Sequence, residues 1–209
     1  LYDGWQLSGA VLKRYQHTNL KQLEKQLQTK TKLTSCFIVT DGVFSMDGDL
    51  APLPALKDLA KKYNCSLVVD DAHGTGVVGP SGKGTAAYWR TEADIEIGTL
   101  SKALASLGGF VVASKEVKEY LVNKARPFIF TTALPPACLA AALAALTVRQ
   151  NEGGRQERLL ALAKKVRTAL KEQQLNVPAG ITPIIPIIVG SEALAVKLAQ
   201  LCWEKGVFI

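Results

Sequence analysis

The stretch LVVDDAHGTG, residues 67–76, carries two carboxylates and an imidazole directly after a short apolar run. The apolar run is typical of a buried strand, and the polar residues Asp70, Asp71 and His73 follow at its carboxyl end. Open α/β sheets bind ligands at that end of their strands. A lone Asp or His more often caps a turn or bonds the backbone, but three polar groups crowded before close-fitting glycines favour a site.

A second stretch, DIEIGTLSK at residues 94–102, has the same design. Its apolar part predicts a strand that ends in the hydroxyl residues Thr99 and Ser101 and then in Lys102. No charged residue occurs from 103 to 114, so we expect the Lys102 amine to lie in a dry environment. Desolvation lowers the pKa of a lysine and favours the neutral, nucleophilic amine.

Short apolar runs and helical repeats extend this pattern along the chain. Strands are predicted at 36–40, 66–69, 95–98, 110–113 and 128–130, with an edge strand at 184–189 and the start of another at 207–209. Helices are predicted at 20–28 behind the capping residue Asn19, at 54–63, from 136 to about 150, at about 155–173, and after Ser191. Strands alternating with helices predict an α/β fold with a mostly parallel sheet between helices.

The composition sets limits on the class of protein. The chain has 209 residues, of which 48% are hydrophobic and 21% are charged, as in an ordinary globular protein. No run is apolar enough to span a membrane. The four cysteines are widely spaced, which favours reduced thiols in the cytoplasm, and the net charge of +7 is dispersed, which argues against nucleic acid as a partner. The start carries no secretory signal and no methionine, so a fragment is expected.

The two polar strand ends together suggest pyridoxal phosphate as cofactor. This cofactor needs a lysine for its aldehyde, a carboxylate for its ring nitrogen and donors for its phosphate. Lys102, Asp70 and the hydroxyls of Thr99 and Ser101 match these needs, and His73 could bond the phenolic oxygen or the ring face. The nearby stretch GPSGKGT, residues 79–85, superficially resembles a nucleotide-binding loop, but its spacing fails because Val77 stands where the first glycine belongs. We interpret it as a mobile glycine-rich loop.

Four stretches in register carry a family resemblance. DGVFSMDGD at 41–49, VDDAHGTG at 69–76, GTLSK at 98–102 and RPFIFTTALPP at 126–136 resemble the α-oxoamine synthases, which are fold-type I pyridoxal-phosphate enzymes. The resemblance implies a partial large, cofactor-binding domain at 1–151. It also implies a linker helix and the beginning of a small C-terminal domain at 152–209.

The resemblance also assigns roles to residues. Lys102 would bond the cofactor aldehyde and later act as general base, and Asp70 would pair with the ring nitrogen. His73 and Ser45 would lie near the phenolic oxygen, and Thr99 would bind the phosphate. No metal ligand is implied.

Two further threonines, Thr131 and Thr132, would reach the phosphate of the neighbouring subunit, which implies a homodimer. Asp41 stands where the family commonly has glutamate, which leaves its role open. The resemblance further implies that a phosphate loop and a ring-stacking histidine precede residue 1 and that a carboxylate-binding arginine follows residue 209. This chain alone is therefore expected to be inactive.

The implied reaction joins an amino acid to an acyl thioester with loss of carbon dioxide. Residues 126–136 most resemble the member that uses L-alanine and a pimeloyl thioester, carried by coenzyme A or acyl carrier protein, in biotin biosynthesis. Members that use glycine with an acetyl or succinyl thioester are the alternatives. A catalytically silent subunit is a further alternative, although such a subunit would be expected to lack Lys102.

Overall fold

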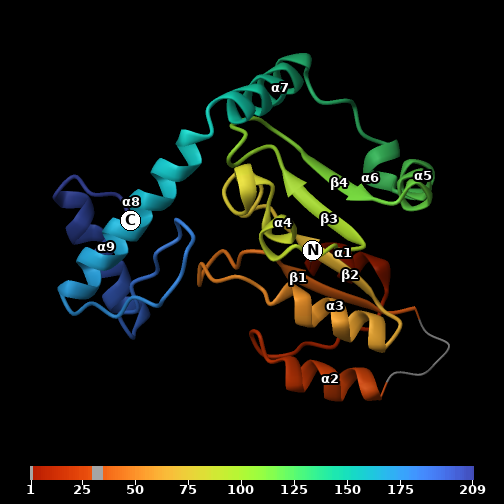
Figure 1. The fold of residues 1–209 in the computed structure, drawn as a ribbon, viewed down its shortest axis with the longest axis horizontal. Coiled ribbons are helices and arrows are strands. Elements are labelled where there is room, and N and C mark those ends of the chain that lie inside the picture. The colour runs from red at the N-terminus through yellow and green to blue at the C-terminus, as the bar shows by residue number, and fades with distance from the viewer. Residues whose placement is uncertain (1, 30–34) are drawn as a thin grey trace.

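The computed structural model describes residues 2–29 and 35–209, and a four-stranded sheet lies at its centre (Figure 1). The strands lie in the order β1 (Phe37–Asp41), β2 (Ser66–Asp70), β3 (Ile95–Thr99) and β4 (Gly109–Ala113). The first three pair in parallel, and β4 runs antiparallel to β3. The predicted α/β fold with a mostly parallel sheet is confirmed, and these four predicted strands match to within a residue at each end.

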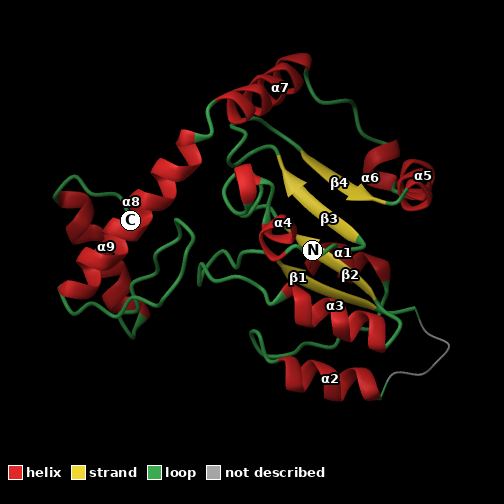
Figure 2. Cartoon of the chain, in the orientation of Figure 1, coloured by secondary structure: helices red, strands yellow, loops and turns green. Residues whose placement is uncertain are grey.

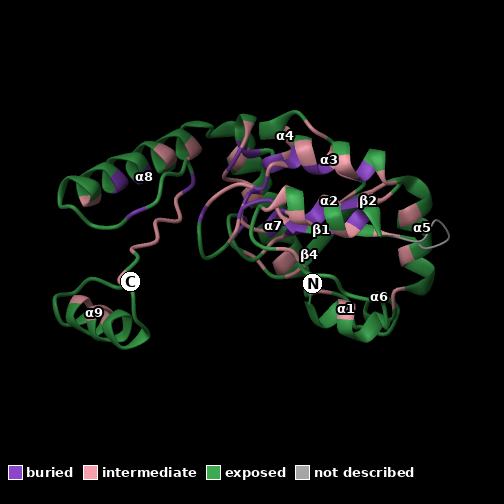
Figure 3. Cartoon of the chain, turned by 90° about the horizontal axis from the view of Figure 1, so that it is seen from below, coloured by how far each residue is buried: buried purple, intermediate pink, exposed green. Residues whose placement is uncertain are grey.

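Two helices, α2 (Leu20–Gln28) and α3 (Leu53–Lys62), form the main core with β1 and β2 (Figures 1 and 3). The side chain of Asn19 caps α2 by accepting a hydrogen bond from the amide of Gln22 at 3.0 Å, as the sequence predicts. The core consists of aliphatic side chains from these four elements and from Ala51, just before α3: Leu23, Leu27, Ile38, Ala51, Leu53, Leu56, Ala60, Leu67 and Val69. Burial of this cluster fixes β1 and β2, the strands that carry Asp41 and Asp70.

The remaining helices surround the sheet or follow it (Figure 2). They are α1 (Tyr2–Ser8), the 3₁₀ turn η1 (Pro80–Gly82), α4 (Thr85–Trp89), α5 (Lys115–Lys124), α6 (Arg126–Ile129), α7 (Pro136–Asn151), α8 (Gly154–Glu172) and α9 (Glu192–Glu204). The predicted helices α7, α8 and α9 are confirmed, the last with Ser191 as its cap. Within residues 2–29 and 35–209, no helix has both the length and the hydropathy needed to cross a bilayer.

Three predicted strands are wrong. The run 128–130 lies at the end of α6 and the turn after it, because Pro127 occupies the first turn of that helix and cannot donate in a ladder. The run 184–189 forms no strand, since Pro183 and Pro186 remove two donors. The amide of Ile188 in this run donates to the Asn176 carbonyl at 2.9 Å. Residues 207–209 are also outside any strand.

The glycine-rich segment 79–85 forms hydrogen bonds with its neighbours, and its mobility stays a prediction. The amide of Gly84 donates to the Val78 carbonyl at 2.8 Å, and the amide of Gly76 donates to the Gly82 carbonyl at 2.8 Å. From α7, the Arg149 guanidinium donates to the same Gly82 carbonyl at 2.9 Å. These hydrogen bonds restrain the backbone at positions where glycine would otherwise allow many conformations.

Helices α7 and α8 are separated by the non-helical residues Glu152 and Gly153, and α8 and α9 lie beside the sheet rather than on it (Figures 1 and 2). One link between the two parts is the buried hydroxyl of Thr182, which donates to the Gly48 carbonyl at 2.6 Å. The guanidinium of Arg167, buried on α8, donates to the carbonyls of Thr182 and Ile184. The turn after β1 is therefore attached to the C-terminal part.

Candidate functional site

Three parallel strands bring polar residues to one edge of the sheet. Asp41 ends β1 and Asp70 ends β2, and the two are partners in the parallel register. On the next strand Ile97 is the partner of Asp70, so Thr99, the last residue of β3, lies just beyond it in the same direction. The site therefore forms at the carboxyl ends of the strands, where α/β sheets bind ligands.

His73 lies on the turn that leaves β2. The amide of Ala72 donates to Asp70 Oδ1 at 3.1 Å, and the amide of Gly74 donates to the Asp71 carbonyl at 3.0 Å. These short bonds curl the chain immediately after the strand, so that His73 stays next to the strand ends instead of extending away from them.

The electrostatic surroundings of His73 identify its neighbours. Burial lowers the pKa of His73, the charge of Lys102 lowers it further, and the carboxylates of Asp41 and Asp70 act in the opposite direction. A cation and two anions from three different strand ends thus act on one imidazole. The lowered pKa keeps that imidazole neutral at neutral pH, and a neutral ring can both donate and accept a proton.

Asp41 belongs to the same group of charges. Burial raises the pKa of its carboxyl, the neighbouring Asp70 raises it further, and His73 opposes the rise. The sequence left the role of Asp41 open, and the structure shows that Asp41 places a second carboxylate beside Asp70 and His73.

Lys102 lies on the loop that connects β3 to β4. Thr99 organises this loop, because its hydroxyl contacts that of Ser101 at 2.7 Å and donates to the Gly108 carbonyl at 3.1 Å. The expected dry environment of Lys102 is not found, since the residue is exposed in this chain. The uncharged residues after it do not cover it: Leu104 is buried, but Leu107 is 54% exposed.

Three further residues that the resemblance assigns to the site lie on other segments of the chain. Ser45 is exposed on the turn that follows β1. Thr131 and Thr132 are exposed on the long connection between α6 and α7 (Figure 1), where the Thr131 hydroxyl donates to the Thr132 carbonyl at 3.2 Å. The structure therefore brings together Asp41, Asp70, His73 and Lys102, with Thr99 and Ser101 on the adjoining loop.

Sequence reasoning gave no role to Asp71. Its carboxylate is buried, with 4% exposure, and accepts hydrogen bonds from Thr85. The local signal was only that a second acid follows Asp70. Its partner Thr85 lies fourteen positions further along the chain, and no sequence pattern links Thr85 to β2.

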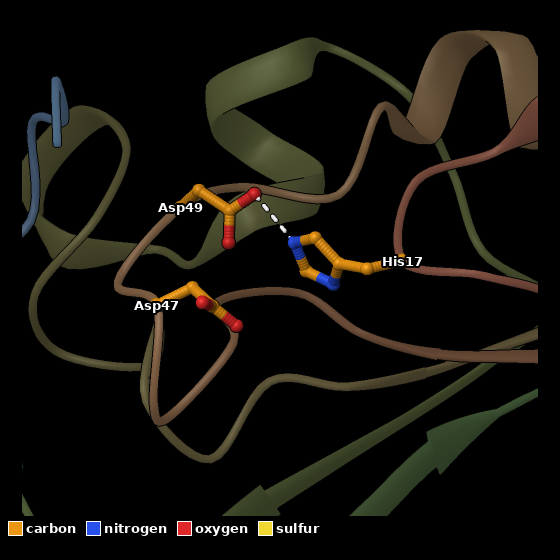
Figure 4. A group of neighbouring side chains, drawn as sticks. All are labelled: His17, Asp47 and Asp49. Carbon is orange, nitrogen blue, oxygen red and sulfur yellow. Dashed lines mark hydrogen bonds and ion pairs between the residues drawn. The ribbon is translucent and has the colours of Figure 1, made fainter. Parts of the chain in front are cut away.

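A second polar cluster lies on the turn that carries Ser45 (Figure 4). His17 Nε2 contacts Asp49 Oδ2 at 2.8 Å, and Asp47 lies beside them with its ligand atoms within 4.8 Å of the others. The ring of His17 also meets the edge of Phe44 at a centroid distance of 4.2 Å. These contacts attach the segment before α2 to the turn after β1, which accounts for the cluster structurally.

Comparison with known proteins defines the class. The family described as aminotransferase class I and II matches residues 1–209, and the chain belongs to this family. It is 46% identical over 213 residues to the 8-amino-7-oxononanoate synthase of Geobacter sulfurreducens, covering 100% of this chain and 54% of that protein. The chain thus spans about half the length of the curated relatives it matches.

Solved structures agree with this assignment. A serine palmitoyltransferase from S. paucimobilis with a bound PLP–myriocin aldimine superposes with a TM-score of 0.95 at 30% identity, covering 100% of this chain and 55% of that one. The 8-amino-7-oxononanoate synthase from Francisella tularensis superposes with a TM-score of 0.84 at 32% identity, covering 99% and 61%. The predicted fold-type I architecture and the family resemblance are confirmed.

Proposed function

We propose that the protein is a pyridoxal-phosphate-dependent acyltransferase that condenses L-alanine with a pimeloyl thioester, giving 8-amino-7-oxononanoate for biotin biosynthesis. The thioester would be carried by coenzyme A or by acyl carrier protein. The observation that carries the proposal is the convergence of Asp41, Asp70, His73 and Lys102 at one sheet edge. The identity to the Geobacter sulfurreducens enzyme supports the choice of reaction.

The residues at this edge suit the cofactor by their chemistry. Asp70 offers a carboxylate to a protonated ring nitrogen, and Lys102 offers an exposed amine to an aldehyde. The Thr99 and Ser101 hydroxyls, 2.7 Å apart, offer two donors to a phosphate. His73 offers a ring N–H to a phenolic oxygen. Each of these side chains is compatible in charge and hydrogen bonding with the cofactor group that it would contact.

The roles of these residues follow from their charges. When bound, the cofactor supplies an electron sink for charge that develops at the amino-acid Cα. Asp70 would keep the ring nitrogen protonated through a charge-assisted hydrogen bond. Lys102 would take the Cα proton at Nζ as general base. His73, held neutral beside Lys102, would orient the substrate side of the ring without adding charge.

Borohydride reduction tests the cofactor site on the full-length protein. Reduction makes the C=N bond between a lysine and the cofactor permanent, so we expect the pyridoxyl group on the peptide that contains Lys102. Lys83→Ala serves as the control, because Lys83 is exposed on the nearby glycine-rich segment. Label on another lysine, or unchanged labelling in Lys102→Ala, would refute the assignment.

Two further reactions are kept as alternatives for the same site. Glycine C-acetyltransferase and 5-aminolevulinate synthase use the same chemistry with glycine. Because the chain superposes on a serine palmitoyltransferase, serine is included in the test as well. Assays of the full-length protein with alanine, glycine and serine against pimeloyl, acetyl, succinyl and palmitoyl thioesters separate them. We expect the highest kcat/KM for alanine with the pimeloyl thioester. A partner subunit without catalytic function would turn over none of these pairs.

The assembly and location are also proposals. A homodimer would let the exposed Thr131 and Thr132 reach the phosphate of the neighbouring site, and it would cover exposed side chains such as Phe128 and Phe130, which are 63% and 71% exposed. The four cysteines form no disulfide within the described residues, which fits the reducing cytoplasm. We place the boundary between the large domain, 1–151, and the C-terminal part, 152–209, where α7 ends at Asn151.

A further inference from the structure

We propose that Asp71 is a positioning residue, whose buried carboxylate fixes the turn that presents Asp70 and His73 to the cofactor. The inference rests on the proposed function and extends it to a residue that touches neither substrate nor cofactor. Asp71 lies between the two residues it would position, and its side chain is buried.

The carboxylate of Asp71 collects donors from two segments. The Thr85 amide donates to both oxygens at 3.2 Å, and the Thr85 hydroxyl donates to Oδ1 at 2.5 Å. The Thr75 hydroxyl donates to Oδ2 at 3.4 Å. Thr85 is the first residue of α4 and is fully buried. One side chain therefore joins the two ends of residues 71–85, the segment that includes the His73 turn.

The backbone of Asp71 completes the attachment. Its amide donates to the Ile97 carbonyl of β3 at 2.7 Å, and its carbonyl accepts from the amides of Gly74 and Thr75 at 3.0 and 2.8 Å. The same residue thus connects β3, which leads to Lys102, with the turn that carries His73. A displacement of Asp71 would change the relation between those two functional residues.

Three glycines close around the carboxylate. A Cβ added at Gly42, Gly74 or Gly84 would overlap an oxygen of Asp71. Gly42 follows β1, Gly74 belongs to the His73 turn, and Gly84 precedes α4. The backbone from three segments therefore approaches the carboxylate more closely than any side chain would permit, and this leaves Asp71 a single position.

The charge of Asp71 is costly, which argues for a role beyond packing. Burial raises the pKa of its carboxyl, the hydrogen bonds from Thr85 and Thr75 oppose that rise, and the nearby Asp70 adds to it. No cation pairs with Asp71 in the part of the chain that the structure describes. A buried carboxylate that only neutral donors hold contributes little to stability, but its hydrogen bonds fix the orientation of the groups around it.

The test compares Asp71→Asn with Asp58→Asn in the full-length protein. Asp58 is exposed on α3, so the control loses the same charge without losing the contacts. An asparagine keeps one acceptor oxygen and puts an NH₂ donor in the place of the other, where it would face the donating Thr85 amide. The readouts are the pKa of His73 from its NMR titration in cofactor-free protein, with the signal assigned by its loss in His73→Gln, and the dissociation constant of pyridoxal phosphate.

We expect Asp71→Asn to raise the pKa of His73 toward its ordinary value, because a loosened turn exposes the ring, and to weaken cofactor binding by about tenfold. A lower melting temperature with an unchanged His73 titration and unchanged cofactor binding would overturn the proposal, since Asp71 would then act on stability alone. If the parent protein binds no cofactor, the proposed function fails, while the titration still tests Asp71.

Thr85 provides a milder pair in case Asp71→Asn does not fold. Thr85→Ser keeps the hydroxyl and the amide donors, whereas Thr85→Val keeps the shape and loses the hydroxyl. We expect the valine variant to shift the His73 titration in the same direction as Asp71→Asn, and the serine variant to match the parent. Identical titrations in the two variants would also overturn the proposal.

Discussion

Asp41 and Asp70 are register partners at the ends of two parallel strands, so two carboxylates stand side by side at the edge of the sheet. The pKa of Asp41 is raised by burial and then by the charge of Asp70. The neutral His73 and the cationic Lys102 complete the group, which contains two carboxylates and one amine. The arrangement suits a ligand that carries both a positive ring nitrogen and a negative oxygen.

Asp41→Asn is expected to stabilise the cofactor-free protein at neutral pH. Because the native pKa of Asp41 is raised, the native state binds its proton more tightly than the unfolded state does. The carboxyl therefore costs stability above its native pKa, and the cost disappears as the pH falls below the unfolded value of about 3.9. Urea titrations at several pH values should show a gain that shrinks toward acid. A gain independent of pH would contradict this reason.

Lys102→Met is expected to raise the pKa of His73. Lys102 lowers that pKa by its charge, whereas burial, the larger cause, would remain. The rise should therefore be partial and should leave the pKa below its ordinary value. An NMR titration of the imidazole measures it, with Lys83→Met as the control. No change in Lys102→Met would mean that the loop after β3 does not approach the turn after β2 in solution.

The site residues that follow directly after a strand could be predicted from the sequence. Asp70, His73, Thr99 and Lys102 each lie within a few residues of an apolar run, so the parallel pairing that the run implies is enough to bring them to one edge. The position of Asp41 depends on the register of β1 against β2, which cannot be read from the sequence. Its place beside Asp70 appeared only in the structure.

Features that depend on distant partners were missed. The buried state of Asp71 is caused by Thr85 and three glycines from separate segments, and no local pattern links them. The exposure of Lys102 likewise depends on what covers the loop, which neighbouring apolar residues do not decide. The predicted strand 128–130 was wrong for a local reason. The aromatic residues of this run favour a strand, but Pro127 favours the first turn of a helix.

Asp70→Asn is expected to keep part of the cofactor affinity and to lose activity by about a hundredfold or more, because an amide cannot sustain a proton on the ring nitrogen. The substitution leaves the fold nearly intact, since the asparagine oxygen can still accept from the amide of Ala72, which now donates to Asp70 Oδ1 at 3.1 Å. Steady-state kinetics and cofactor titration of the full-length protein measure the two effects, with Asp58→Asn as the control. Turnover near that of the parent would remove Asp70 from its role.

Gly48→Ala is expected to destabilise the protein by about 2 kcal/mol, because the position combines two local demands. The backbone of Gly48 has a φ of 69°, and an added Cβ would lie 2.6 Å from the Ile184 carbonyl oxygen, across the contact between the turn after β1 and the C-terminal part. The carbonyl of Gly48 also accepts the hydrogen bond from buried Thr182, so relief of the overlap would break that bond. Gly153→Ala is the matched control, since its φ is −55° and nothing lies within 4 Å of an added Cβ. Urea unfolding of both variants gives the comparison: equal midpoints would mean that the turn after β1 and residue 184 are not in contact in solution.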